Sequence, residues 1–110
     1  MPVEMQLNDQ VLQAKIIGEI DHHTAKDIRE AIDEKLMNAL PKELRLDFTR
    51  VSFMDSSGIG LVMGRYKTAH EIGCRVSVSG ANPRTVKVFR LSGLSKFVEI
   101  QGGSRNEITQ

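Results

Sequence analysis

Asp55, Ser56, Ser57 and Gly58 are the residues of this chain whose types and spacing could carry chemistry. An apolar segment precedes them and apolar residues at helical spacing follow, so they stand at the start of a predicted helix. Such a start offers unpaired backbone N–H groups and the positive end of the helix dipole. The four residues could therefore be a helix cap, a phosphate cradle, a serine nucleophile or a phosphorylation site.

Residue spacing disfavours two of these four interpretations. A phosphate-binding loop would need a later glycine or a Gly-Lys-Ser/Thr sequence after Gly58-Ile59-Gly60, and neither is present. The Gly-x-Ser-x-Gly pattern of a serine nucleophile is absent, and His22, His23 and His70 have no sequence link to either serine. A helix cap and a phosphate acceptor both remain open. The alternative function is a small nucleotide- or anion-binding module that uses the same helix end.

Two carboxylates are expected near the serines. Asp55 is adjacent to Ser56, and Asp21 ends another predicted strand that would open on the same sheet edge. A phosphate here would be stabilised by the positive end of the helix dipole and repelled by the carboxylates. We therefore expect phosphorylation to change surface charge at an interface rather than to refold the domain. Gly58 removes side-chain bulk, so another group could approach the backbone closely.

The surrounding pattern predicts an α/β fold in one domain. Val3–Leu7 and Val11–Ile17, joined by an Asn8-Asp9 turn, predict an antiparallel hairpin. Strands and helices then alternate, which favours a mostly parallel sheet with right-handed crossovers. The further predicted elements are strands at 44–48, 74–79 and 97–100, helices at 25–40, 59–73 and 83–93, a capping box at Thr24 and Asp27, an Asn82 cap followed by Pro83, and a polar tail at 103–110.

Composition narrows the class of protein. A chain of 110 residues with 40% hydrophobic content is one domain with a sizeable core. Its net charge of +1, with acids and bases interleaved, gives no footprint for nucleic acid and no polybasic membrane patch. The lone Cys74 cannot form an internal disulfide, and neither a signal peptide nor a membrane-spanning stretch is evident. We expect a monomer in the cytoplasm.

The second predicted helix has an outer face that could bind a partner. At 100° per residue this face is centred near Thr68 and carries Leu61, Gly64, Arg65 and Ile72. Single exposed apolar residues are normal on a protein surface, but a solvated face is usually more charged than this one. We predict a docking surface in which Gly60 and Gly64 allow a partner to approach closely.

The histidines do not predict a metal site. His22 and His23 diverge on a helix, and no third ligand is spaced nearby. His70 falls on the inner side of the second helix and is expected to be partly buried. No metal and no cofactor is expected.

Four segments of the chain together resemble the STAS domain family. They are Gly18-Glu19-Ile20-Asp21-His22-His23-Thr24-Ala25, the stretch from Ser52 to Gly60 containing Met-Asp-Ser-Ser-Gly, Gly64-Arg65-Tyr66-Lys67 and Leu91-Ser92-Gly93-Leu94. The resemblance covers nearly the whole chain and implies a compact β/α domain. It also implies a partner-switching regulator of sporulation, an anti-anti-sigma factor that is not an enzyme.

The resemblance further implies partners and a switch residue. The unphosphorylated form would bind a dimeric anti-sigma factor that is also a serine kinase, and so free the sigma factor without contacting it. The kinase would phosphorylate Ser56, causing release, and a membrane-bound serine phosphatase would reset the protein. Asp21 and Asp55 match acidic positions beside the phosphate acceptor, and Ser57 matches a second serine that is usually not modified.

Overall fold

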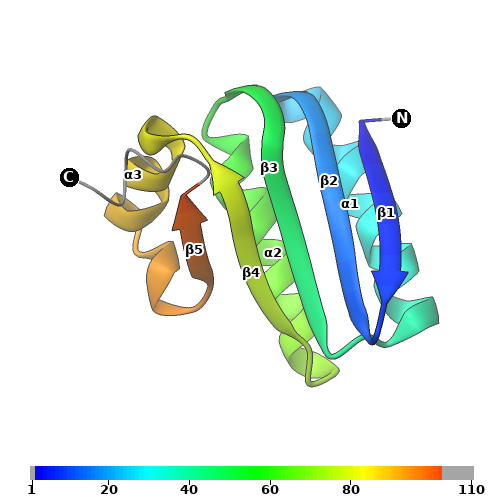
Figure 1. Ribbon diagram of the computed structural model, residues 1–110. Coiled ribbons are helices and arrows are strands. Elements are labelled where there is room, and N and C mark those ends of the chain that lie inside the picture. Colours follow the sequence, from blue (N-terminus) through cyan, green and yellow to red (C-terminus); the bar gives the residue numbers. More distant parts are fainter. Residues whose placement is uncertain (1, 103–110) are drawn as a thin grey trace.

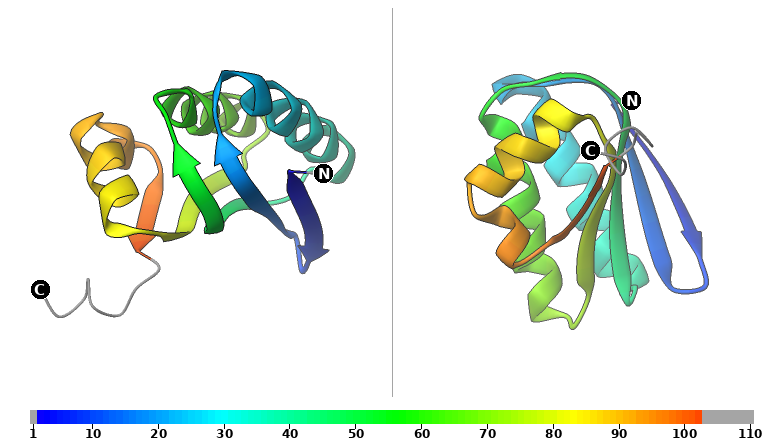
Figure 2. Two further views of the ribbon diagram at one scale, coloured as in Figure 1. Left: turned by 90° about the horizontal axis from the view of Figure 1, so that it is seen from above. Right: turned by 60° about the vertical axis from the view of Figure 1, so that its left-hand side comes forward.

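A computed structural model describes residues 2–102, in which three α-helices lie on one face of a five-stranded sheet (Figures 1 and 2). Along the chain the elements are β1 (Val3–Asn8), β2 (Val11–Ile20), α1 (His22–Ala39), β3 (Glu43–Met54), α2 (Ser57–Glu71), β4 (Arg75–Ala81), α3 (Pro83–Leu91), the short 3₁₀ helix η1 (Leu94–Lys96) and β5 (Glu99–Gly102).

The strands lie side by side in the same order as in the sequence, from β1 to β5. The first pair is antiparallel and the other three pairs are parallel. Each pair of consecutive parallel strands is connected by a helix, and the chain moves across the sheet in one direction. Because such crossovers have the same hand, their helices all lie on one side of the sheet. The predicted α/β fold with an N-terminal hairpin is confirmed.

The hairpin turn is formed by Asp9 and Gln10, one residue later than predicted. Both have left-handed backbones, with φ of 49° and 67°, as in the two-residue turns that match the twist of an antiparallel pair. Asn8 is the last residue of β1 and pairs with Val11.

The sheet is apolar on its helix side and polar on its other face. Alternate residues of β2 and β3, such as Leu12 and Leu44, are fully buried against the helices. On the open face, Gln13 Nε2 donates to Asp47 Oδ2 at 3.2 Å, and Ser77 Oγ donates to Glu43 Oε2 at 3.0 Å. Helix residues that complete the core are Ile28, Ile32 and Leu36 of α1, Val62 and Ala69 of α2, and Phe89 of α3.

Most predicted boundaries differ from the structure by a few residues, and three of the differences are informative. The first helix begins at His22, because its capping box joins Asp21 and Thr24 rather than Thr24 and Asp27. The strand predicted at 44–48 continues to Met54, and the last strand begins at Glu99 after η1. The predicted polar tail at 103–110 lies outside the described residues.

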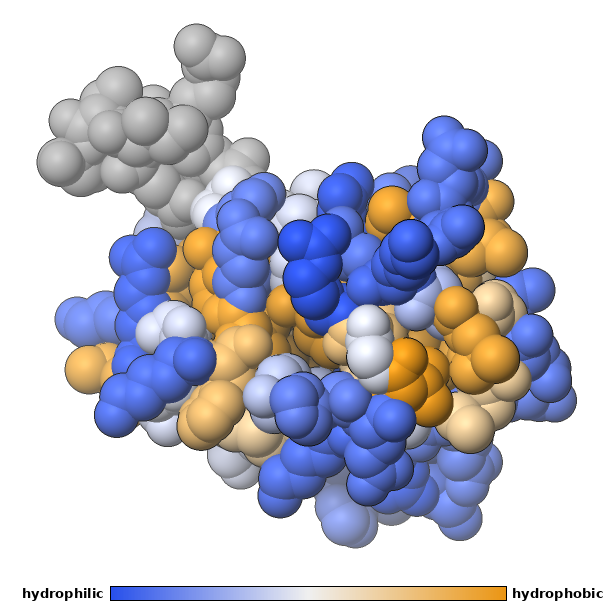
Figure 3. Space-filling model, turned by 90° about the horizontal axis from the view of Figure 1, so that it is seen from below, coloured by the Kyte–Doolittle hydropathy of each residue, from blue (hydrophilic) through white to orange (hydrophobic). Residues whose placement is uncertain are grey.

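The end of the molecule at which β2, β3 and β4 begin exposes both hydrophobic and hydrophilic side chains (Figure 3). Figure 3 shows hydrophobic areas there that are separated by hydrophilic side chains. Within residues 2–102 no helix is both long and apolar enough to cross a membrane.

Candidate functional site

The junction between β3 and α2 is closed by Asp55. Its Oδ1 accepts a hydrogen bond from the backbone N–H of Ser57 at 2.7 Å. Its carbonyl oxygen accepts from the N–H of Gly58 at 3.0 Å, and the carbonyl of Ser56 accepts from the N–H of Ile59 at 3.1 Å. These three amides of the first turn thus have acceptors within the chain, which disfavours the anion-binding alternative.

Ser56 is the N-cap residue of α2 by position, but its side chain does not cap the helix. Its backbone is right-handed (φ −62°, ψ −16°), and its hydroxyl makes no capping hydrogen bond. The residue is exposed, whereas Ser57, the first helical residue, is half-buried. Ser56 therefore presents the more accessible of the two hydroxyls.

Gly58 packs against a side chain of its own chain. It is buried, and a Cβ at this position would overlap Sδ and Cγ of Met54. The sequence analysis predicted that another group could approach the backbone at Gly58. That group is Met54, the last residue of β3.

Asp21 and Asp55 belong to the β2–α1 and β3–α2 junctions. Both junctions lie at the upper end of the sheet in Figure 1. Ile20 pairs with Met54, and the N–H of Asp55 donates to the carbonyl of Ile20 at 3.1 Å. The expectation that both carboxylates open on one sheet edge agrees with this pairing.

The carboxylate of Asp21 is engaged with the start of α1. Asp21 Oδ1 accepts from the backbone N–H groups of Thr24 and His23, each at 2.9 Å. These bonds, chiefly the one from Thr24, hold the pKa of Asp21 below its usual range. In return, Thr24 Oγ1 accepts from the N–H of Asp21 at 2.9 Å. Asp21 is thus an ionised cap of its own helix.

The predicted outer face of α2 is wrong for two of its residues. Leu61 and Arg65 are buried, at 4% and 5% exposure, because α1 packs along this side of α2. Arg65 Nε lies 2.8 Å from Asp33 Oδ1 of α1. Burial lowers the pKa of the Arg65 guanidinium, and the Asp33 carboxylate opposes that shift. The helical wheel locates the side facing away from the sheet, but it does not reveal a neighbouring helix.

The exposed surface of α2 runs through Gly60, Gly64 and Lys67. Gly60 and Lys67 are exposed, and Gly64 and Thr68 are half-buried. A Cβ at Gly60 or Gly64 would have no atom within 4 Å. The two glycines therefore leave open space above the helix, unlike Gly58.

The sequence analysis missed a group of basic side chains on α1. His22, His23, Lys26 and Arg29 line a cleft together with Ser57 at the start of α2. The available signal was helical spacing, since positions 22, 26 and 29 fall on one side of a helix. Each residue taken alone is an ordinary surface residue.

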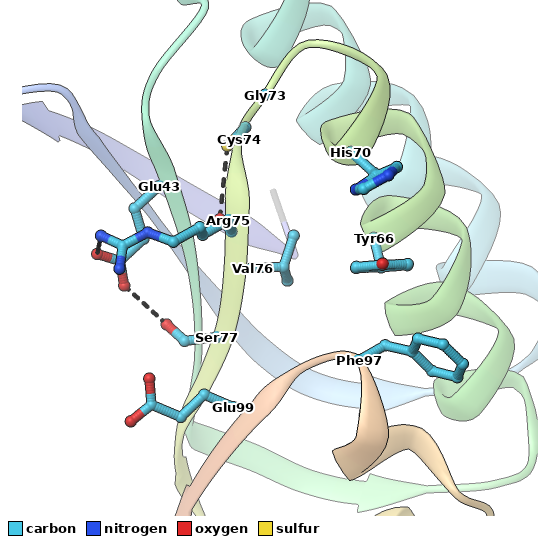
Figure 4. A pocket seen from close by; sticks show the side chains of 10 residues that line it. All are labelled: Glu43, Tyr66, His70, Gly73, Cys74, Arg75, Val76, Ser77, Phe97 and Glu99. Carbon is cyan, nitrogen blue, oxygen red and sulfur yellow. Dashed lines mark hydrogen bonds and ion pairs between the residues drawn. The ribbon is translucent and has the colours of Figure 1, made fainter.

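A second cavity lies at the other end of α2, about 400 Å³ in volume (Figure 4). On its aromatic wall the ring of His70 stacks on that of Tyr66, and the ring of Phe97 is tilted against Tyr66 on another side. Each pair of ring centroids is 5.5 Å apart. The predicted burial of His70 is wrong, because the residue is exposed near the end of the helix. His70 is thus at the opposite end of α2 from Ser56 and Ser57.

Over residues 2–102, the geometry gives neither serine of the site a histidine partner and groups no set of metal ligands. Within residues 2–102, no hydrogen bond joins Ser56 or Ser57 to an imidazole. Over the same residues, no group of three or more His, Cys, Asp or Glu side chains could hold a metal ion. Cys74 is a buried free thiol whose pKa is raised by desolvation. What the site offers is an exposed Ser56 hydroxyl, without a capping hydrogen bond, at a helix start that Asp55 caps.

A family model described as the STAS domain matches residues 2–105. The chain belongs to the STAS domain family. The β-hairpin and the parallel βα units described above are therefore the fold of a STAS domain.

Curated relatives of this STAS domain include antagonists of two anti-sigma factors. The anti-sigma F factor antagonist of Paenibacillus polymyxa is 33% identical over 110 residues, which cover all of this chain and 94% of the relative. The anti-sigma-B factor antagonist of Bacillus subtilis is 27% identical and covers 96% of this chain and 95% of the relative.

Solved structures that are similar to this chain include an anti-sigma factor antagonist in two phosphorylation states. The anti-sigma factor antagonist SpoIIAA in its unphosphorylated form matches 97% of this STAS domain and 92% of that chain, with 29% identity and a TM-score of 0.77. The Bacillus cell fate determinant SpoIIAA in its phosphorylated form matches 97% of this chain and 96% of that one, with 29% identity and a TM-score of 0.71.

Proposed function

We propose that this STAS domain is an anti-sigma factor antagonist that is switched off by phosphorylation of Ser56. The observation that carries the proposal is the exposed Ser56 hydroxyl, which makes no capping hydrogen bond at a helix start that Asp55 already caps. Relatives named as anti-sigma factor antagonists, one of them solved in a phosphorylated form, support the same role.

Phosphorylation at Ser56 leaves the fold intact. A phosphoserine adds about −1.5 to −2 charges at neutral pH. Asp55 and Asp21 remain bound to their own helix starts, and Ser57 and Gly58 keep their places in the first turn. The modification changes the charge of the surface and leaves the helix cap in place.

The switch acts on a partner protein. The unphosphorylated domain binds an anti-sigma factor with serine kinase activity and so releases the sporulation sigma factor, which it does not itself contact. The docking surface runs over Gly60, Gly64 and Thr68, and the buried Leu61 and Arg65 support it from below. A serine phosphatase restores the binding form. The domain has no catalytic activity of its own and works as a monomer in the cytoplasm.

Phosphate mapping tests this proposal. The purified domain is incubated with its cognate anti-sigma factor and ATP, and the phosphate is located by mass spectrometry. We expect phosphate on Ser56 in the native domain and in Ser57→Ala, and none in Ser56→Ala. Phosphate on Ser57 alone would contradict the assignment of the switch residue.

A further inference from the structure

A cleft of about 540 Å³ separates the N-terminal halves of α1 and α2, beside the proposed phosphorylation site. Four of the five α1 residues on one wall are basic, and the other wall is formed by the first turns of α2. The complete lining is His22, His23, Ala25, Lys26 and Arg29 from α1 with Ser57, Gly60 and Leu61 from α2.

The two cations in this cleft, Lys26 and Arg29, form no ion pair among the described residues. None of its lining residues is acidic. Among residues 2–102, neither Lys26 nor Arg29 has a carboxylate oxygen within 4.0 Å of its charged nitrogens. The acidic residue that follows on this side of α1, Asp33, is paired with the buried Arg65. The whole chain has a net charge of only +1, so this concentration of positive charge is a local feature.

A solvated basic side is common on surface helices, but two features distinguish this one. The cleft has a buried apolar floor at Leu61. Its other wall is open above the backbone at Gly60, where a Cβ would meet no atom within 4 Å. An extended chain segment could therefore lie against α2 while its side chains reach the cations of α1.

We infer that this cleft binds an acidic segment of the anti-sigma factor. The inference rests on the proposed function and adds the chemistry of the contact, in which carboxylates of the partner pair with Lys26 and Arg29. Charge complementarity of this kind accelerates encounter and fixes the register of an interface.

The cleft also explains how a phosphate on Ser56 releases the partner. Ser56 immediately precedes Ser57, which lines the cleft. A phosphate dianion at this rim competes with the partner's carboxylates for the same cations and repels those carboxylates. Release thus follows from local electrostatics, with the helices unmoved.

The test compares two charge reversals on one helix. The variant Lys26→Glu/Arg29→Glu removes the cleft cations, and Lys35→Glu, also exposed on α1 but outside the cleft, is the control. Affinity for the purified cognate anti-sigma factor is measured by calorimetry at two salt concentrations. We expect the double variant to bind at least tenfold more weakly than the control, with a smaller dependence on salt. The neutral Lys26→Gln/Arg29→Gln variant should fall between them.

The outcomes separate this inference from the proposed function. If the native domain binds and the double variant binds like Lys35→Glu, the cleft does not contact the partner and the inference is overturned, while the proposed function stands. If the native domain itself neither binds nor is phosphorylated, the proposed function fails first. Charge-dependent binding of ATP by the isolated domain would assign the cleft to a nucleotide and also overturn the inference. Circular dichroism checks that each variant is folded.

Discussion

Two adjacent strand–helix junctions in this molecule cap the first backbone amides of their helices with different residues. At the β2–α1 junction, the N-cap residue Asp21 binds two amides of its own helix, and Thr24 completes the reciprocal bond. At the β3–α2 junction, the N-cap residue Ser56 makes no such bond, and the preceding Asp55 binds the first amide instead. The second helix start is therefore capped while its N-cap side chain remains free.

The difference indicates how a modifiable side chain can be placed at a helix start. If Ser56 were the cap, a phosphate on its oxygen would alter a bond that stabilises α2. Because Asp55 has that role, the state of the Ser56 hydroxyl can change without altering that bond. The second helical residue differs too, because it is the exposed His23 in α1 and the buried Gly58 in α2.

The largest effect is expected for partner binding when Ser56 becomes acidic. Ser56→Glu should weaken binding to the anti-sigma factor at least 100-fold, because it introduces a permanent negative charge at the docking surface. Ser56→Ala should bind like the native domain. Calorimetric titration measures both, and Ser95→Glu, the same change at an exposed residue of η1, is the control. Equal binding by Ser56→Glu and Ser95→Glu would remove the functional distinction between the two junctions.

The next effect concerns the tight contact below the β3–α2 junction. Gly58→Ala should destabilise the domain by about 1–3 kcal/mol, since the new Cβ overlaps Met54. In a Met54→Ala background, where the overlapping side chain is absent, Gly58→Ala should lower the free energy of unfolding by less than it does in the native domain. Urea unfolding measures the free energy of each variant.

The matched control for Gly58 is Gly60, two residues further along the same helix. Gly60→Ala fills open space and should stabilise α2 by about 0.5–1 kcal/mol through helix propensity. Destabilisation of similar size at both glycines would show that the contact with Met54 does not matter.

A smaller effect distinguishes Asp55 from Ser56. Asp55→Ala should lower the free energy of unfolding by about 1 kcal/mol, because it removes the acceptor for the Ser57 amide. Ser56→Ala should change it by less than about 0.5 kcal/mol, although Ser56 is the N-cap residue by position. Chemical denaturation of the two variants checks this directly. If Ser56→Ala proves the more harmful, the assignment of the cap is wrong.

Local sequence signals predicted the elements well. The hairpin follows from alternation and turn residues, and the start of α3 follows from Asn82 and Pro83, where Asn82 Oδ1 accepts from the N–H of Thr85 at 2.8 Å. These signals are contained in a few neighbouring residues, so a single sequence carries them.

Features that depend on distant residues were harder to predict. The burial of Leu61 and Arg65 is set by α1, and the Arg65–Asp33 pair joins residues far apart in the chain. The Ser56 hydroxyl makes no capping bond because the Asp55 side chain points toward the Ser57 amide and caps the helix instead. The residue types alone do not determine which of the two side chains is the cap. The sequence therefore left cap and phosphate acceptor open, and the choice of Ser56 over Ser57 came from the family resemblance.

The smallest effect is a pH dependence at the other junction. The pKa of Asp21 is lowered in the folded domain, chiefly by the Thr24 amide, so the folded state binds the proton of this carboxyl more weakly than the unfolded state does. The cap therefore stabilises the fold fully above the unfolded pKa of about 3.9 and loses that contribution as pH falls through the lower folded value. Asp21→Asn should be less stable than the native domain near neutral pH, with a difference that shrinks below about pH 4. Urea unfolding from pH 6 to the acid limit of folding measures this difference, and a gap that stays constant with pH would indicate that the Asp21 cap does not depend on its charge.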